Sequence, residues 1–242
     1  LYDLSPADIA RPAWQAWNID LTGMTGLENV TTLTIGVDGA SAAGMLYIDD
    51  IRLYPLPGEQ VTPIEPTTGL LAHYNLNNNT QDDSGRGHHG TVVGDARFAD
   101  DADRGGVVNF NGFDALVTVP HAGELSFGAS DAYSVAAWVH PASLSGSWTG
   151  VVTKSRDATP WYGIWIDGGN NWLFGHDGDN MAGSAAVAGT WTHVTVTYDN
   201  GQKRIYLNGL LDSESTSSMD GSGSGDLVIG GVLGVSEFFE GW

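Results

Sequence analysis

The sequence contains no cysteine, so neither disulfide bonds nor zinc-thiolate sites can stabilise its fold. It has no apolar run approaching the roughly eighteen residues that a membrane-spanning helix needs, so we expect no insertion into a membrane. Charged residues make up only 16% of the chain, and lysine and arginine are the scarcer among them.

The few charges are strongly unbalanced. There are 29 acidic residues against nine Lys and Arg, which gives a formal net charge of −20. Repulsion from such a surface argues against nucleic acid or an anionic membrane as a partner. Carboxylate-rich surfaces do attract calcium, a hard cation that prefers oxygen ligands. The 34 glycines, spread among short β-branched and aromatic runs, predict many tight turns between strands.

The chain falls into three regions by composition. Residues 1–57 contain three strand-like runs, and three strands rarely bury a core alone, so we interpret this region as the end of a domain. Residues 58–68 hold prolines and glutamates without an apolar pattern, which is typical of a linker. Residues 69–242 alternate strand-like runs with turn signals at short spacing. This pattern predicts an all-β fold, an antiparallel β-sandwich.

The most regular run is TWTHVTVTYD. Its alternation predicts one face made of Thr192, Val194, Val196 and Tyr198. His193 lies on the other face together with Trp191. We expect His193 to be a satisfied, partly buried core histidine and not a catalytic one, because no serine or cysteine nucleophile with a partner acid is suggested nearby.

Residues 69–242 resemble a laminin-G-like domain of the concanavalin A-like lectin/glucanase superfamily, in the form found in large bacterial surface proteins. The resemblance is carried by GLLAHYNLNNNTQDDSGRGHHGTVVG, VVNFNGFDALVTVP, YSVAAWVHP, GTWTHVTVTYDNGQKRIYLNGLL and DLVIGG. It implies a jelly-roll sandwich in which an element like FFEGW precedes a last strand of the form I-D-D-x-R-x-Y. We therefore expect residues 69–242 to lack that strand.

Residues 1–57 resemble the C-terminal strands of a galactose-binding-like jelly roll, through WQAWNIDL, VTTLTIGV and LYIDDIRLYP. Two explanations for the last strand of the following domain stay open. The chain is a segment of a longer protein, or LYIDDIRLYP itself occupies the slot, within its own chain or in a neighbouring copy.

The laminin-G resemblance implies a calcium site at the loop QDDSGRGHHG. Its ligands would be oxygens of Asp82, Asp83, Asn111 and Asp114, completed by the absent strand. The alternative is an ordinary turn closed by aspartate side chains.

Asp49 and Asp50 point to opposite faces of their strand, so one of them is buried whichever face is covered. The resemblance to the jelly rolls implies a structural calcium at this pair, and the alternative is an ion pair between Asp50 and Arg52 or solvation at an edge.

Sugar binding is the function that the aromatic residues favour, because indole rings stack on sugar faces while Asp and Asn bind hydroxyl groups. If the isoleucine face of WYGIWID is the core, Trp161 and Trp165 point outward. The candidate carbohydrate-binding residues are Trp148, Trp161, Trp165, Asp177 and Asn180. The alternative is that these rings cover the sandwich or dock on a neighbouring domain.

Catalysis is not expected. A retaining glycosidase needs two carboxylates about 5–5.5 Å apart, and we find no run of the E-x-D-x-x-E type that would place such a pair on one strand face. Asp212 and Glu214 have the i,i+2 spacing, but they end a hairpin strand next to a Ser/Gly loop. We expect a non-catalytic extracellular or cell-surface module that binds a polysaccharide or another glycan. The alternative is a structural repeat of a filament or surface layer, whose partners are neighbouring copies or domains of the same protein.

Overall fold

The computed structural model describes residues 69–242, apart from 103 and 219, and the chain divides into two units, Leu1–Glu65 and Pro66–Trp242. The predicted jelly-roll strands, with Asp49 and Asp50, lie outside the described residues. In the described part, no helix has the length and apolar character needed to cross a membrane.

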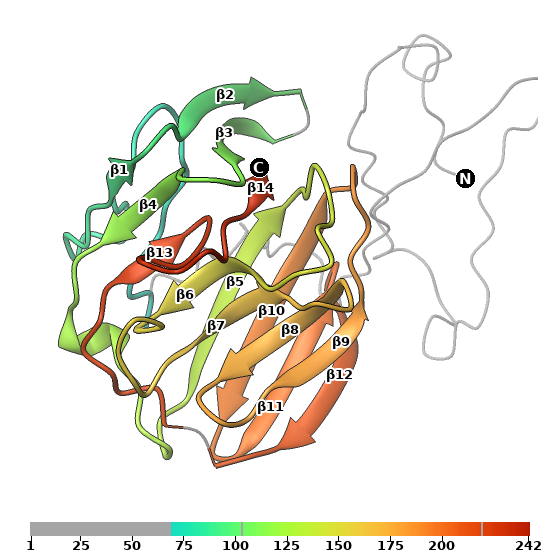
Figure 1. Cartoon of the computed structure of the whole chain (residues 1–242). Coiled ribbons are helices and arrows are strands. Elements are labelled where there is room, and N and C mark those ends of the chain that lie inside the picture. The colour runs from blue at the N-terminus through green and yellow to red at the C-terminus, as the bar shows by residue number, and fades with distance from the viewer. Residues whose placement is uncertain (1–68, 103, 219) are drawn as a thin grey trace, which may run out of the picture. The chain divides into compact units, whose positions relative to one another are not determined.

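The described residues form three antiparallel sheets (Figure 1). The seven-stranded sheet, in the order β1-β4-β13-β6-β7-β8-β9, consists of β1 (Thr91–Val93), β4 (Leu116–Val119), β6 (Thr149–Lys154), β7 (Tyr162–Ile166), β8 (Asn171–His176), β9 (Met181–Ala185) and β13 (Leu227–Ile229). The four-stranded sheet, in the order β12-β11-β10-β5, consists of β5 (Tyr133–Val139), β10 (Thr192–Asp199), β11 (Gln202–Leu207) and β12 (Leu210–Thr216). The third sheet, in the order β14-β3-β2, consists of β2 (Arg97–Asp101), β3 (Gly105–Asn111) and β14 (Glu240–Gly241).

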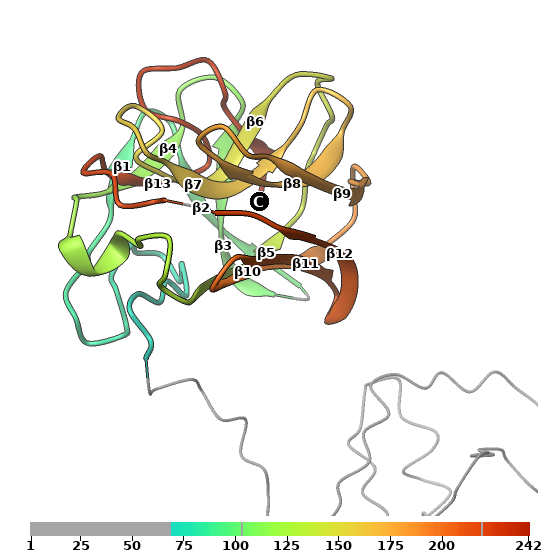
Figure 2. The same cartoon turned by 90° about the horizontal axis from the view of Figure 1, so that it is seen from below.

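The seven-stranded and four-stranded sheets are the two layers of a sandwich (Figure 2). The core lies between them, with Val194, Val196 and Ile205 of the four-stranded sheet in the same apolar cluster as Ile164 and Phe174 of the other. Burial of apolar surface between two sheets is the main source of stability in such a fold. The predicted all-β sandwich is confirmed.

Strand β10 confirms the alternation read from TWTHVTVTYD. Thr192, Val194, Val196 and Tyr198 are all buried, and the residues between them are half-buried. The turn after β11 also follows the sequence, since Asn208 and Gly209 have φ values of 51° and 80°. Asn and Gly adopt this left-handed region at little cost, which makes the pair favourable in a tight hairpin.

The run LLAHYNL, residues 70–76, has the composition of a strand but is not one in this structure, because it has no ladder partner among the described residues. Leu71 and Tyr74 nevertheless pack against the core. The end of the chain does form a short strand, β14. Glu240 and Gly241 pair with Asn111 and Phe110 of β3, while the preceding Phe239 is buried.

Candidate functional site

Two W-x-H motifs meet across the pairing of β5 and β10. Trp138 and His140 come from β5 and the residue after it, and Trp191 and His193 from the residue before β10 and from β10 itself. The strands are antiparallel with His193 opposite Trp138, so each tryptophan faces the histidine of the other motif. The ring centroids are 5.0 Å apart for Trp138 and His193, and 5.2 Å apart for His140 and Trp191.

Trp242 adds a fifth ring to this group. Its indole stacks on His140, with centroids 5.5 Å apart and planes 25° apart, and it lies 6.3 Å from Trp191. Two main-chain hydrogen bonds hold it there, from His140 N to Trp242 O at 2.6 Å and from Trp242 N to His140 O at 3.0 Å. Figure 1 shows β14 beside the end of β5. We call Trp138, His140, Trp191, His193 and Trp242 the aromatic platform.

The aromatic platform lies on the outer face of the four-stranded sheet. Alternate residues of the same strands, Val139 and Val194, belong to the core, so the rings between them point away from it. Trp138 is the most exposed ring of the platform, with 45% of its surface accessible, and the other four rings are half-buried. His193 is therefore not the core histidine that the sequence suggested.

Arg104 lies over the platform from the turn between β2 and β3. Its guanidinium carbon is 3.4 Å from the centroid of the Trp138 ring, which is a close cation–π contact. Burial first, and the charge of Arg104 second, lower the pKa of His193 below its usual value. His193 is consequently a neutral imidazole at neutral pH, able both to donate and to accept a hydrogen bond.

The platform offers aromatic faces, imidazole nitrogens and a guanidinium within one surface. Flat apolar rings bordered by hydrogen-bonding groups suit ligands with an apolar face and a polar rim, as sugars have. Sequence reasoning missed Trp138, His140, Trp242 and Arg104. The repeated W-x-H was a visible signal, but only the pairing of β5 with β10 brings the two motifs together.

The structure places two of the sequence-predicted sugar ligands elsewhere than expected. Trp165 is fully buried and Trp161 is 6% exposed, in a second apolar cluster with Leu173 and Val232. The isoleucine face of β7 is indeed the core, but the chain after β13 covers the opposite face. Glu237 joins that covering chain to the sheet, because one of its carboxylate oxygens accepts a hydrogen bond from Trp165 Nε1 at 2.9 Å.

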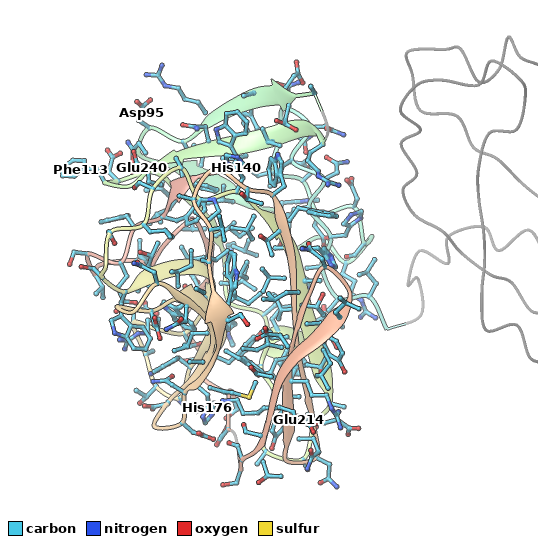
Figure 3. The ribbon with its side chains drawn as sticks, turned by 90° about the vertical axis from the view of Figure 1, so that its right-hand side faces the viewer. Asp95, Phe113, His140, His176, Glu214 and Glu240 are labelled. Carbon is cyan, nitrogen blue, oxygen red and sulfur yellow. The ribbon has the colours of Figure 1, made fainter. Side chains whose placement is uncertain are left out.

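The other three predicted sugar ligands do not join the aromatic platform. Trp148 is exposed in the segment before β6. Asp177 and Asn180 are exposed in the turn that follows β8, whose last residue is His176. Figure 3 shows His140 at one end of the sandwich and His176 at the other.

The predicted calcium ligands are engaged within the chain. Asp82 accepts hydrogen bonds from the main-chain N–H groups of His73, Ser84 and His88 and from the Ser84 hydroxyl, at 2.8 to 3.0 Å. Its carboxylate thus closes the loop that holds residues 70–76 and has no oxygen left free of a donor.

Asp83 accepts a hydrogen bond from Asn75 Nδ2, and Asn111 Oδ1 accepts three from the main chain of its own loop. The Asn111 amide in turn donates to Asp114 at 2.7 Å. Among the described residues, no three His, Asp or Glu side chains gather as a metal site. Calcium binding by Asp82, Asp83, Asn111 and Asp114 stays a prediction.

The loop around Asp82 generates a pH-dependent prediction. Burial alone would raise the pKa of Asp82, but the hydrogen bonds from His73, Ser84 and His88 outweigh burial and lower it to about 2. Because the folded pKa is below the unfolded value, the carboxylate stabilises the fold above about pH 4, and this stability is lost as the pH falls toward 2.

We expect Asp82→Asn to lower the free energy of unfolding by about 2 kcal/mol at neutral pH, since it leaves buried donors poorly satisfied. Denaturant unfolding at neutral pH and at about pH 2 should show the gap to wild type shrinking in acid. Asp83→Asn, at an exposed neighbour, is the control and should change stability little. A gap that is the same at both pH values would be evidence against this role of Asp82.

Trp165 provides a second prediction. We expect Trp165→Ala to lower the free energy of unfolding by about 3–5 kcal/mol, because it empties a buried cluster. Trp138→Ala removes an exposed ring and should cost much less. Thermal unfolding of both variants measures the difference, and equal losses would contradict the placement of the two rings.

The chain was compared with known proteins. No curated protein sequence matches it significantly. The fourth domain of AbnA, a GH43 extracellular arabinanase from Geobacillus stearothermophilus solved in complex with arabinotriose, is 25% identical with a TM-score of 0.57, over 70% of this chain and 86% of that one.

Two toxins share the fold at lower identity. The binding domain of Paraclostridial Mosquitocidal Protein 1 is 13% identical, with a TM-score of 0.54 over 66% of this chain and 43% of that one. Botulinum neurotoxin type C, whose cell entry depends on interaction with two ganglioside molecules, is 16% identical, with a TM-score of 0.54 over 72% of this chain and 43% of that one. This chain thus spans less than half the length of either toxin chain.

A laminin-G family model described as the concanavalin A-like lectin/glucanases superfamily matches residues 111–242. The match covers more than half of the 242 residues and includes β4 to β14 and the whole aromatic platform. The chain belongs to the concanavalin A-like lectin/glucanases superfamily.

Proposed function

We propose that this chain is a non-catalytic carbohydrate-binding module of an extracellular or cell-surface protein, and that its aromatic platform is the binding surface. The observation that carries the proposal is the gathering of five aromatic rings on the outer face of the four-stranded sheet, with Trp138 the most exposed. Stacking on aromatic faces, with hydrogen bonds at the rim, is how proteins commonly hold sugars.

Two further facts support this function. The arabinanase domain that resembles the chain at 25% identity was solved with arabinotriose bound. The platform also supplies no carboxylate, whereas a retaining glycosidase needs two of them about 5–5.5 Å apart. Rings without paired acids suit a module that holds a polysaccharide and leaves cleavage to other domains.

The direct test is calorimetric titration of the full chain with arabinotriose, after a glycan array. Trp138→Ala and Trp191→Ala should each weaken the best ligand roughly tenfold or more, because each removes a stacking face. Phe113→Ala is the matched control, since this ring is 77% exposed in a loop outside the platform, and it should bind as wild type does.

Three results would count against the proposal. They are a flat array with no titration signal, equal weakening by Phe113→Ala, and release of reducing sugar from any bound polysaccharide. Weakening by Trp148→Ala alone would move the site to the segment before β6. Repeating the titration in a chelator tests calcium: we expect unchanged binding at the platform, because none of its rings is a calcium ligand.

A second function, assembly by strand donation, is favoured by the edge of β5. In the described residues, β5 pairs with β10 on one side and on the other only at its end, through His140 and Trp242. Along a strand, the main-chain N–H and C=O groups of every second residue point to the same side. Those of Ser134, Ala136 and Trp138 therefore point to the same side as those of His140. An unpaired edge of this kind accepts an added strand. We propose Leu46–Pro55 of a neighbouring copy as that strand.

Electron microscopy and sedimentation of the purified chain test this assembly. We expect filaments or larger assemblies for wild type and for Ala136→Ser, and monomers for Ala136→Pro, because proline removes a donor from the edge. Monodisperse wild-type monomers, or assembly that survives Ala136→Pro, would exclude donation at β5.

A further inference from the structure

In the part of this acidic protein that the structure describes, the basic side chains are nearly all engaged. Of the nine, Arg11 and Arg52 lie outside the described residues. Lys154 and Lys203 are fully buried and donate to main-chain carbonyl oxygens. Four arginines pair with carboxylates at 2.6 to 3.5 Å: Arg86 with Glu124, Arg97 with Asp95, Arg156 with Glu237 and Arg204 with Glu214.

Arg104 is the exception in the described part of the chain. Its side chain is exposed, and none of the described carboxylates lies within ion-pairing distance of it. Its guanidinium lies on the Trp138 ring instead, 3.4 Å from the centroid. Gly105, with a φ of 74°, follows it in the turn that carries Arg104 to this position.

A guanidinium that rests on an aromatic face keeps its N–H donors at the rim of the contact. Five donors in a planar fork match the two oxygens of a carboxylate, and such charge-assisted hydrogen bonds are stronger than neutral ones. The donors of Arg104 therefore border the exposed ring of Trp138. A sugar that packs against the part of this ring left uncovered by the guanidinium and carries a carboxylate can bind both groups at once.

We infer that the aromatic platform selects acidic glycans, with Arg104 binding the carboxylate of a uronic acid residue that packs against the uncovered part of Trp138. This inference rests on the proposed function, because it assigns a ligand class to the same surface. The Asp101 carboxylate accepts a hydrogen bond from the Arg104 main-chain N–H at 3.0 Å, but the guanidinium forms no ion pair with any described carboxylate. A bound uronate supplies a carboxylate for such a pair.

Charge elsewhere on the protein limits the ligand that the site can take. The remaining surface is acidic and repels a long polyanion, whereas at physiological salt charges beyond roughly 8 Å are largely screened. His140 and His193 are the other titratable groups of the platform, and neither is an acid. The preference should therefore be clearest for short acidic oligosaccharides.

The test compares trigalacturonic acid with its fully methyl-esterified form, titrated into the full chain. The ester keeps the sugar rings and removes the negative charge. We expect the acid to bind roughly five- to tenfold more tightly than the ester, with the preference falling as salt is raised. Arg104→Gln should bind the two forms alike. Arg104→Lys should keep only part of the preference, because it retains the charge and loses the planar fork.

Equal affinity of wild type for the acid and the ester would overturn the inference, as would a preference that survives Arg104→Gln. Either result leaves the proposed function standing if the ester or arabinotriose binds and Trp138→Ala weakens that binding. Absence of binding to every glycan would instead reject the proposed function, and the inference with it.

Discussion

The antiparallel pairing of β5 with β10 is the constraint on which the rest of the site depends. With Trp138 opposite His193, alternate residues of both strands face the seven-stranded sheet and the others face outward. The same register that closes the core with Val139 and Val194 therefore assembles the aromatic platform on the other side. A shift of one residue would exchange the two faces and leave neither the core nor the aromatic platform.

Elements remote in the sequence complete this surface. Trp242, at the other end of the domain, is held to His140 by two main-chain hydrogen bonds, and Arg104 comes from the turn between β2 and β3. The chain after β13 instead covers the outer face of β7. It buries Trp161 and Trp165, and Glu237 holds it to Trp165 by a hydrogen bond. Two sheet faces that carry tryptophan thus differ in exposure. The chain after β13 covers the outer face of β7, whereas Trp138 on the outer face of β5 stays exposed.

The sequence allowed the fold to be predicted well and the site poorly. Alternation in TWTHVTVTYD identified the buried face of β10, because burial imposes a period of two on a strand that is covered on one side. The same rule put Ile164 and Trp165 on opposite faces of β7 but could not reveal that residues after β13 cover Trp165. Both W-x-H motifs can be read in the sequence. They come together only through the long-range pairing of β5 with β10, which no local pattern encodes. LLAHYNL has the composition of a strand and still lacks a ladder partner, since a strand needs a neighbour as well as a pattern.

The central claim is that the platform on β5, β10 and the end of the chain is the surface that meets sugar. It is tested most directly by nuclear magnetic resonance of the isotope-labelled chain during titration with arabinotriose or an acidic trisaccharide. The account predicts that the indole N–H signals of Trp138, Trp191 and Trp242 shift with added ligand while that of buried Trp165 does not. Shifts confined to Trp148, or ligand binding that leaves all three platform signals in place, would contradict it.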